Sequence, residues 1–94
     1  MIIKITSMEN NRQIIGIIGY GRFGQLLANI LQTDFELVIY DAQKSAFTGA
    51  KPSNHIRCAT SASEVYSHAQ IVFLAVPIAL FEAVLDSHKA YLQN

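Results

Sequence analysis

Three glycines, Gly19, Gly21 and Gly24, stand at the spacing Gly-x-Gly-x-x-Gly. An apolar run over 14–18 precedes them, a helical pattern follows, and Asp41 ends a second apolar run. In such a strand-turn-helix the first glycine permits the tight turn out of the strand. The second lets the backbone approach a pyrophosphate, and the third lets the helix pack close to the strand. The pattern therefore predicts a dinucleotide-binding turn.

The charged residues around this turn indicate which dinucleotide it takes. The helix N-terminus offers free N–H groups and a partial positive charge to phosphates, and Arg22 either adds a phosphate contact or is a solvated side chain. Asp41 would accept hydrogen bonds from the adenosine ribose and repel a 2′-phosphate, which favours NAD over NADP. Lys44 would weaken that repulsion, and the competing interpretation of Asp41 is a solvated acid that caps the loop.

A second candidate segment is Ala75-Val76-Pro77, which ends the most hydrophobic run of the chain. Ligands of doubly wound sheets bind at the carboxyl ends of the strands. We therefore expect the backbone of Val76 and Pro77 to line the ribose on the nicotinamide side, against the alternative of a plain strand end.

The remaining reactive residue types predict no catalytic or metal site. His55, His68 and His88 have no metal-ligand spacing, and the latter two are interpreted as structural. Cys58 is expected to be a buried apolar residue in a strand. No acid–base group for hydride transfer can be assembled from these residues.

The elements that must position these residues alternate between strands and helices. Apolar runs predict parallel strands, and the spacing of Phe23, Leu26, Leu27, Ile30 and Leu31 gives the first helix one apolar stripe. Ser61 and Glu64 form a capping box at the start of the second helix. The expected strands cover 14–18, 37–41, 55–59 and 71–76, and the helices 22–32, 61–68 and 80–92, with one helical turn near 45–48 in the loop 42–55.

This order, β-α-β-β-α-β-α, predicts the first half of an α/β fold, a Rossmann-type doubly wound parallel sheet with strand order 3-2-1-4. Residues 1–12 are interpreted as a leader with a short strand at 2–5, and residues 13–94 as a partial dinucleotide-binding domain. The strand 71–76 would form an apolar edge of this sheet. We expect self-association, or the chain's own terminal segment, to cover it.

Composition narrows the class of protein. The 94 residues are 51% hydrophobic and 15% charged, which excludes a disordered chain. The formal net charge of zero gives no electrostatic footprint for nucleic acid or a membrane surface, and no run is long enough for a membrane span. Cys58 is the single cysteine, so no intrachain disulfide can form, and a cytoplasmic location is expected.

Three segments, 17–28, 38–41 and 69–78, resemble the N-terminal part of prephenate and arogenate dehydrogenases, and the resemblance covers roughly 14–90. It implies an NAD(P)-dependent oxidative decarboxylation in tyrosine biosynthesis, with prephenate or arogenate as substrate. In that family a histidine acts on the substrate hydroxyl and arginines hold its carboxylates, in parts that these segments do not match. This chain alone is therefore expected to be inactive. The residues carried over are cofactor-binding: Gly19, Gly21, Arg22, Phe23, Gly24, Asp41, Val76 and Pro77.

Two other classes of protein share the glycine-rich turn. Nucleotide-binding regulatory domains of potassium transporters resemble it, but they have a Gly-Asp-Ala-Thr stretch where this chain reads Arg-Cys-Ala-Thr over 57–60. The N-terminal half of another β-hydroxyacid or imine reductase is the third interpretation. In all three interpretations a nicotinamide or related nucleotide is the ligand.

Overall fold

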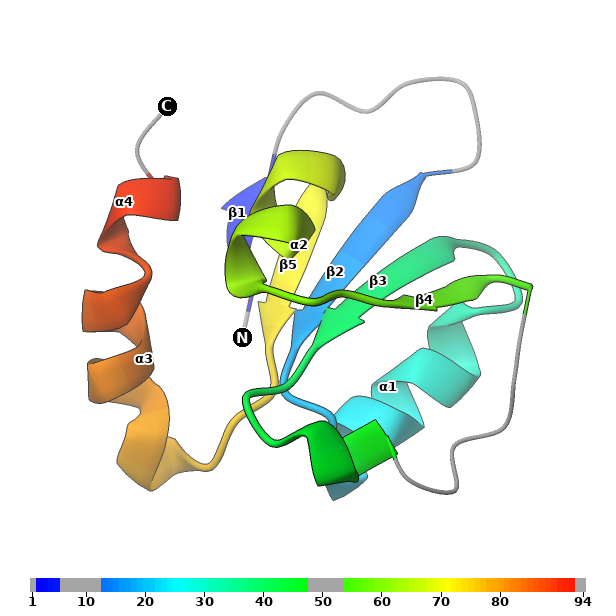
Figure 1. The fold of residues 1–94 in the computed structure, drawn as a ribbon. Coiled ribbons are helices and arrows are strands. Elements are labelled where there is room, and N and C mark those ends of the chain that lie inside the picture. The colour runs from blue at the N-terminus through cyan, green and yellow to red at the C-terminus, as the bar shows by residue number, and fades with distance from the viewer. Residues whose placement is uncertain (1, 6–12, 48–53, 93–94) are drawn as a thin grey trace.

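A five-stranded sheet with the order β1-β5-β2-β3-β4 forms the centre of the molecule (Figure 1). The computed structural model describes residues 2–5, 13–47 and 54–92, with the backbone alone for 2–5, 44 and 45. Strands β2, β3, β4 and β5 are parallel, so the predicted order 3-2-1-4 is confirmed. The strands are β1 (Ile2–Ile5), β2 (Ile14–Ile18), β3 (Glu36–Tyr40), β4 (Ile56–Cys58) and β5 (Ile71–Leu74).

Short helices connect these strands and follow the last of them. They are α1 (Arg22–Leu31), the 3₁₀ turn η1 (Lys44–Phe47), α2 (Ala62–His68), the 3₁₀ turn η2 (Ile78–Leu80), α3 (Phe81–Ser87) and α4 (Lys89–Leu92). The single last helix expected over 80–92 is a wrong prediction, because His88 leaves helical geometry at φ −102° and ψ 7°. The helical turn predicted near 45–48 is present as η1, whereas residues 48–53 lie outside the described part.

Strand β1 covers the outer edge of β5. It runs antiparallel to β5, and Ile5 pairs with Ile71 while Lys4 pairs with Val72. The register is irregular between Ile2 and Lys4. The segment expected as a leader therefore contributes a strand to the sheet, and the chain's own N-terminal segment covers the edge that the sequence marked as exposed. Self-association stays a prediction.

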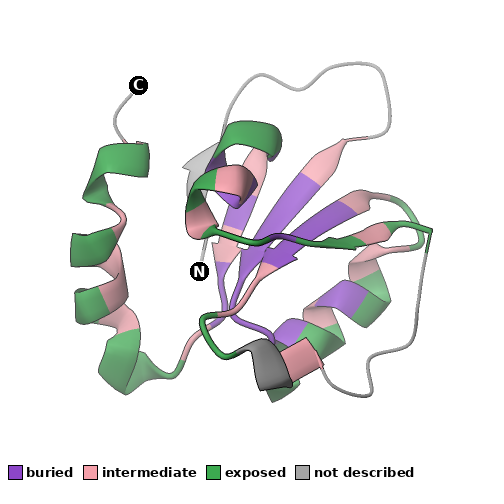
Figure 2. Cartoon of the chain, in the orientation of Figure 1, coloured by how far each residue is buried: buried purple, intermediate pink, exposed green. Residues whose placement is uncertain are grey.

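The helices cover the two faces of the sheet and bury a core on each (Figures 1 and 2). Helices α2, α3 and α4 pack on one face, over a cluster that includes Val38, Val72 and Leu74. Helix α1 packs on the other face, over a cluster with Ile17 and Ile39. The central strands β2 and β3 are buried on both faces, as expected of parallel strands.

Gly16 explains how closely α2 approaches the sheet. A Cβ atom at Gly16 would lie 2.5 Å from Val65 Cγ1 and 3.0 Å from the Ala69 Cβ. Because both neighbours belong to α2 or its C-cap, the helix can pack here only against a residue without a side chain.

The apolar stripe predicted for α1 faces the sheet only in part. Phe23, Leu26 and Ile30 are 55%, 54% and 59% exposed, whereas Gly24 and Ala28 are the buried residues of the helix. The two small residues let the backbone of α1 approach the sheet closely, which rotates the large side chains toward solvent. Of the predicted stripe, Leu27 and Leu31 therefore pack against the core, whereas Phe23, Leu26 and Ile30 do not.

Strand β4 is shorter and more exposed than expected. It covers three residues instead of the predicted 55–59, and Cys58 is exposed, so the prediction of a buried cysteine is wrong. The reason is its position at the edge of the sheet, where β3 is its only partner among the described strands. No helix in the described part of the chain is long and apolar enough to cross a membrane.

Candidate functional site

The turn between β2 and α1 is held by its first and third glycines. Gly19 has φ +107°, a conformation that residues with side chains rarely adopt, and its N–H donates to the Tyr40 carbonyl oxygen at 2.7 Å. Gly24 is buried, and a Cβ there would overlap the Gly19 carbonyl group, whose carbon would lie 3.0 Å away. The glycine spacing thus lets α1 begin directly beneath the end of β2.

The middle glycine leaves open space in front of the helix. Gly21 is the N-cap of α1 in extended geometry (φ −77°, ψ −159°), without a side-chain capping hydrogen bond. A Cβ atom at Gly21 would meet nothing within 4 Å. The first N–H groups of a helix have no partner within the helix, and the first turn of α1 has no acidic residue. This end of α1 is therefore an open cradle with unsatisfied donors, which suits an anionic group such as a pyrophosphate.

Asp41 joins this turn to the end of β3. Its Oδ2 accepts a hydrogen bond from the Tyr20 N–H at 2.7 Å, and its Oδ1 accepts one from the Gln43 N–H at 2.8 Å. Each carboxylate oxygen retains a further lone pair. The carboxylate therefore caps the loop, as the competing interpretation of the sequence held, and keeps acceptor capacity toward the adjoining cavity.

A cavity of about 380 Å³ lies at the carboxyl ends of β2, β3 and β5. Gly19, Gly21, Asp41, Val76 and Pro77 are among the residues that line it. A neighbouring cavity of about 320 Å³ shares four of the lining residues, Gly21, Ala75, Val76 and Pro77, and adds Arg22 and Phe23. Thus the fold brings together every predicted cofactor residue except Gly24, which lies beneath the turn and acts through packing.

Sequence reasoning missed the histidine of this cavity. His88, interpreted as structural, lines the larger cavity, and the Tyr66 hydroxyl lies 2.8 Å from its Nδ1. The spacing of Leu80, Val84 and His88, one residue every four, could have placed all three on one helical face. The partner Tyr66 gave no such signal, because it lies 22 residues away on α2.

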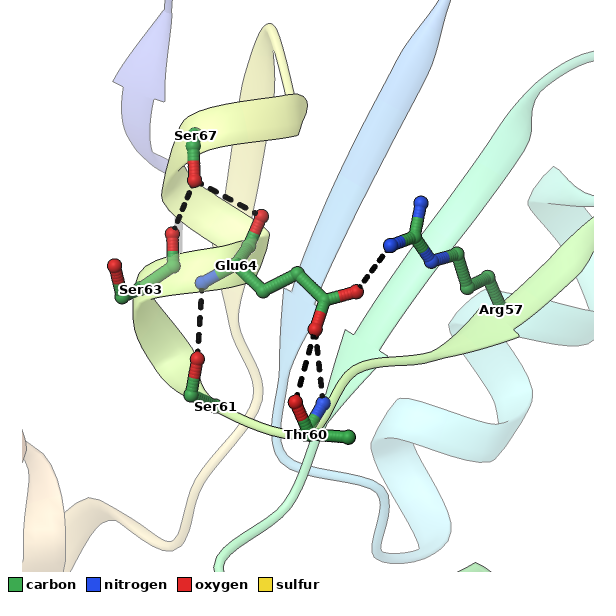
Figure 3. Close-up of polar contacts among 6 residues, drawn as sticks. All are labelled: Arg57, Thr60, Ser61, Ser63, Glu64 and Ser67. Carbon is green, nitrogen blue, oxygen red and sulfur yellow. Dashed lines mark hydrogen bonds and ion pairs between the residues drawn. The ribbon is translucent and has the colours of Figure 1, made fainter.

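The loop after β4 is fixed by Glu64, a residue of the predicted capping box (Figure 3). The Glu64 N–H donates to Ser61 Oγ at 3.2 Å, as predicted. The carboxylate accepts hydrogen bonds from the backbone N–H and the hydroxyl of Thr60, both at 3.1 Å, and pairs with Arg57 at 2.5 Å. The Thr60 backbone N–H lowers the pKa of Glu64, and the Thr60 hydroxyl and Arg57 lower it further.

Glu64→Gln is expected to destabilise the fold at neutral pH but not in acid. A carboxyl whose folded pKa is depressed stabilises the fold above its ordinary pKa of 4.5, and this contribution disappears as the pH falls through the folded value. The melting temperature of the variant should lie below that of the wild type at neutral pH and approach it below pH 4.5. A difference that stays constant from neutral pH to about pH 3 would contradict this role.

A known protein family matches the part of the chain that carries this site. Residues 14–94 match the model of the family described as "NADP oxidoreductase coenzyme F420-dependent". The chain belongs to this family. The match begins at the first residue of β2 and includes the glycine-rich turn, Asp41 and helices α1 to α4, whereas β1 lies outside it.

Membership in the NADP oxidoreductase family supports a nicotinamide dinucleotide as the cofactor of this Rossmann-type domain. It does not distinguish NAD from NADP, and it does not single out prephenate or arogenate dehydrogenase. No curated protein matches the chain.

Proposed function

We propose that this chain is the NAD-binding part of a dehydrogenase of the prephenate or arogenate type. The observation that carries the cofactor proposal is the open cradle at Gly21, which faces the same cavity as the carboxylate of Asp41. A pyrophosphate at the N-terminus of α1 would meet the free N–H groups, and the adenosine ribose would lie within reach of Asp41. When bound, a nicotinamide dinucleotide supplies the hydride acceptor.

The preference for NAD over NADP follows from the charge of the cavity. Among the described residues that line the larger cavity, Asp41 is the only acidic or basic one apart from a histidine. Arg57, a described cation at the neighbouring strand β4, is paired with Glu64. A 2′-phosphate near Asp41 would therefore meet a fixed negative charge without a described arginine or lysine side chain in the cavity wall.

The proposal of prephenate or arogenate as substrate rests on the resemblance of three segments, 17–28, 38–41 and 69–78. Another β-hydroxyacid or imine reductase is equally compatible with the family match. The same match favours these oxidoreductases over a regulatory nucleotide-binding domain of a potassium transporter. No catalytic acid or base is assigned within the described residues.

Calorimetric titration with NAD and with NADP tests the proposed cofactor. We expect NAD to bind more tightly than NADP to the wild type. Asp41→Asn should weaken NAD binding by about tenfold, since an acceptor toward the ribose is lost. It should also reduce the difference in affinity between NAD and NADP, because the negative charge is gone. Ser63→Ala, which changes an exposed residue of α2, serves as the control and should bind both dinucleotides as the wild type does.

Absence of binding by the wild type would contradict the proposed function itself. An NAD affinity that Asp41→Asn leaves unchanged would contradict the role given to this carboxylate.

A further inference from the structure

We propose that His88 binds the dinucleotide, through an Nε2–H group that Tyr66 orients and that donates a hydrogen bond to a ribose or phosphate oxygen. This inference rests on the proposed function. It goes beyond the glycine-rich turn and Asp41, because it adds a donor from the C-terminal end of α3.

Helix α3 places the imidazole at the cavity. Leu80, Val84 and His88 follow one another at intervals of four residues and all line the larger cavity. The backbone N–H of His88 donates to the Val84 carbonyl oxygen at 3.0 Å and to that of Leu85 at 3.2 Å, which holds the residue at the end of the helix. The remaining wall that α3 contributes is apolar, so His88 is its polar group.

Tyr66 holds the other side of the ring. Its side chain is 3% exposed, and its hydroxyl lies 2.8 Å from His88 Nδ1. The ring of Tyr91 stacks on that of Tyr66, with centroids 5.3 Å apart, and lies edge-on to the imidazole at 5.7 Å. The two nitrogens of an imidazole point in diverging directions. With Nδ1 directed at Tyr66, Nε2 faces away from the tyrosine.

The protonation of this pair leaves one donor nitrogen on the imidazole. Burial raises the pKa of Tyr66 to about 12, and Tyr91 adds to this, so the hydroxyl keeps its proton at neutral pH. Burial also lowers the pKa of His88, so the ring is neutral there. A neutral imidazole has one donor and one acceptor nitrogen. We assign the Tyr66 O–H as the donor to Nδ1 in this contact, and the ring proton then lies on Nε2.

Asp41 and His88, two of the polar residues that line the cavity, are chemically complementary. Asp41 offers acceptors, which suit the hydroxyl groups of a ribose, and His88 offers a donor, which suits a phosphate or ribose oxygen. A dinucleotide presents both kinds of group along one edge. A cavity with apolar walls and a few converging polar groups is the usual form of a cofactor site.

Titration of NAD against a set of variants tests the role of His88. His88→Leu should weaken NAD about fivefold, the net worth of one hydrogen bond. His88→Gln places an amide N–H near the position of Nε2 and should stay within about twofold of the wild type. Tyr66→Phe keeps the ring but loses the hydroxyl, and should weaken NAD about twofold through a mixed tautomer. His68→Leu, at the exposed end of α2, is the matched control and should bind as the wild type does.

Nitrogen-15 NMR of the histidine rings distinguishes a binding role from a merely structural one, because NAD would not shift the Nε2 resonance of a purely structural histidine. In the wild type we expect the Nε2–H tautomer of His88, an Nε2 resonance that shifts on addition of NAD, and a mixture of tautomers in Tyr66→Phe. This measurement needs no substitution at His88, so it decides the matter even if His88→Leu does not fold.

Different results would overturn the role of His88 and the proposed function. If the wild type binds NAD while His88→Leu binds it equally well, or if the Nε2 resonance does not move, the role of His88 is overturned and the proposed function stands. If the wild type binds neither NAD nor NADP, both are overturned.

Discussion

Gly19→Ala is expected to lower the free energy of unfolding by about 4 kcal/mol. Gly19 has φ +107°, so an alanine there would be strained whatever space surrounds it. The added Cβ would also overlap the Ala75 carbonyl group, whose carbon would lie 2.9 Å away. Strain and overpacking each cost about 1–3 kcal/mol, and neither backbone segment can move without breaking the sheet.

Chemical denaturation of the variant measures this effect. A domain of this size has a stability of about 5–15 kcal/mol, so the variant should show a much lower midpoint or be partly unfolded without denaturant. Gly21→Ala is the control, because its Cβ would meet nothing within 4 Å and only the weaker N-cap preference of alanine is lost. A Gly19→Ala variant within about 1 kcal/mol of the wild type would contradict this account of the turn.

The contrast between Gly19 and Gly21 shows that the three glycines of the motif serve different purposes. Gly19 and Gly24 have backbone neighbours where a side chain would lie, so they are required by the fold itself. Gly21 has no such neighbour, so its lack of a side chain is not explained by the packing of the described residues. Only the middle glycine therefore points to a ligand.

Much of the fold was predictable because parallel strands carry a strong local signal. The apolar runs of β2, β3 and β5, with the glycine-rich turn, predict the order of the parallel strands. The meeting of Gly21, Asp41 and Pro77 at one cavity followed from this order, since all three lie at carboxyl ends of strands.

The remaining features depend on contacts that the sequence does not record. The periodicity of α1 defines an apolar stripe but does not say which of its residues contact the sheet. The helix packs on the side that carries the small residues Gly24 and Ala28, which are its buried residues. Cys58 is exposed because nothing pairs with the outer edge of β4 in the described part of the chain. The Tyr66–His88 contact joins two helices that are separated in the chain by β5.

Gly21→Asp is expected to weaken NAD binding at least a hundredfold without loss of stability. Aspartate is a preferred N-cap residue and its charge favours the N-terminus of α1, so the fold should be as stable as the wild type or more so. The same carboxylate would occupy the cradle and face the pyrophosphate. Two like charges about 4 Å apart repel by roughly 4 kcal/mol at an effective dielectric constant of about 20, which exceeds a factor of a hundred in affinity.

Two further variants separate the causes of this loss. Gly21→Ser keeps the N-cap preference without the charge, so it should weaken NAD less than Gly21→Asp does. Asn29→Asp adds the same charge at an exposed position of α1 away from both cavities, and should leave the affinity within about twofold. Affinity is measured by calorimetric titration and stability by thermal unfolding of the same samples. A folded Gly21→Asp variant that binds NAD within about threefold of the wild type would show that the pyrophosphate does not lie at this glycine, because a carboxylate in the cradle must repel it.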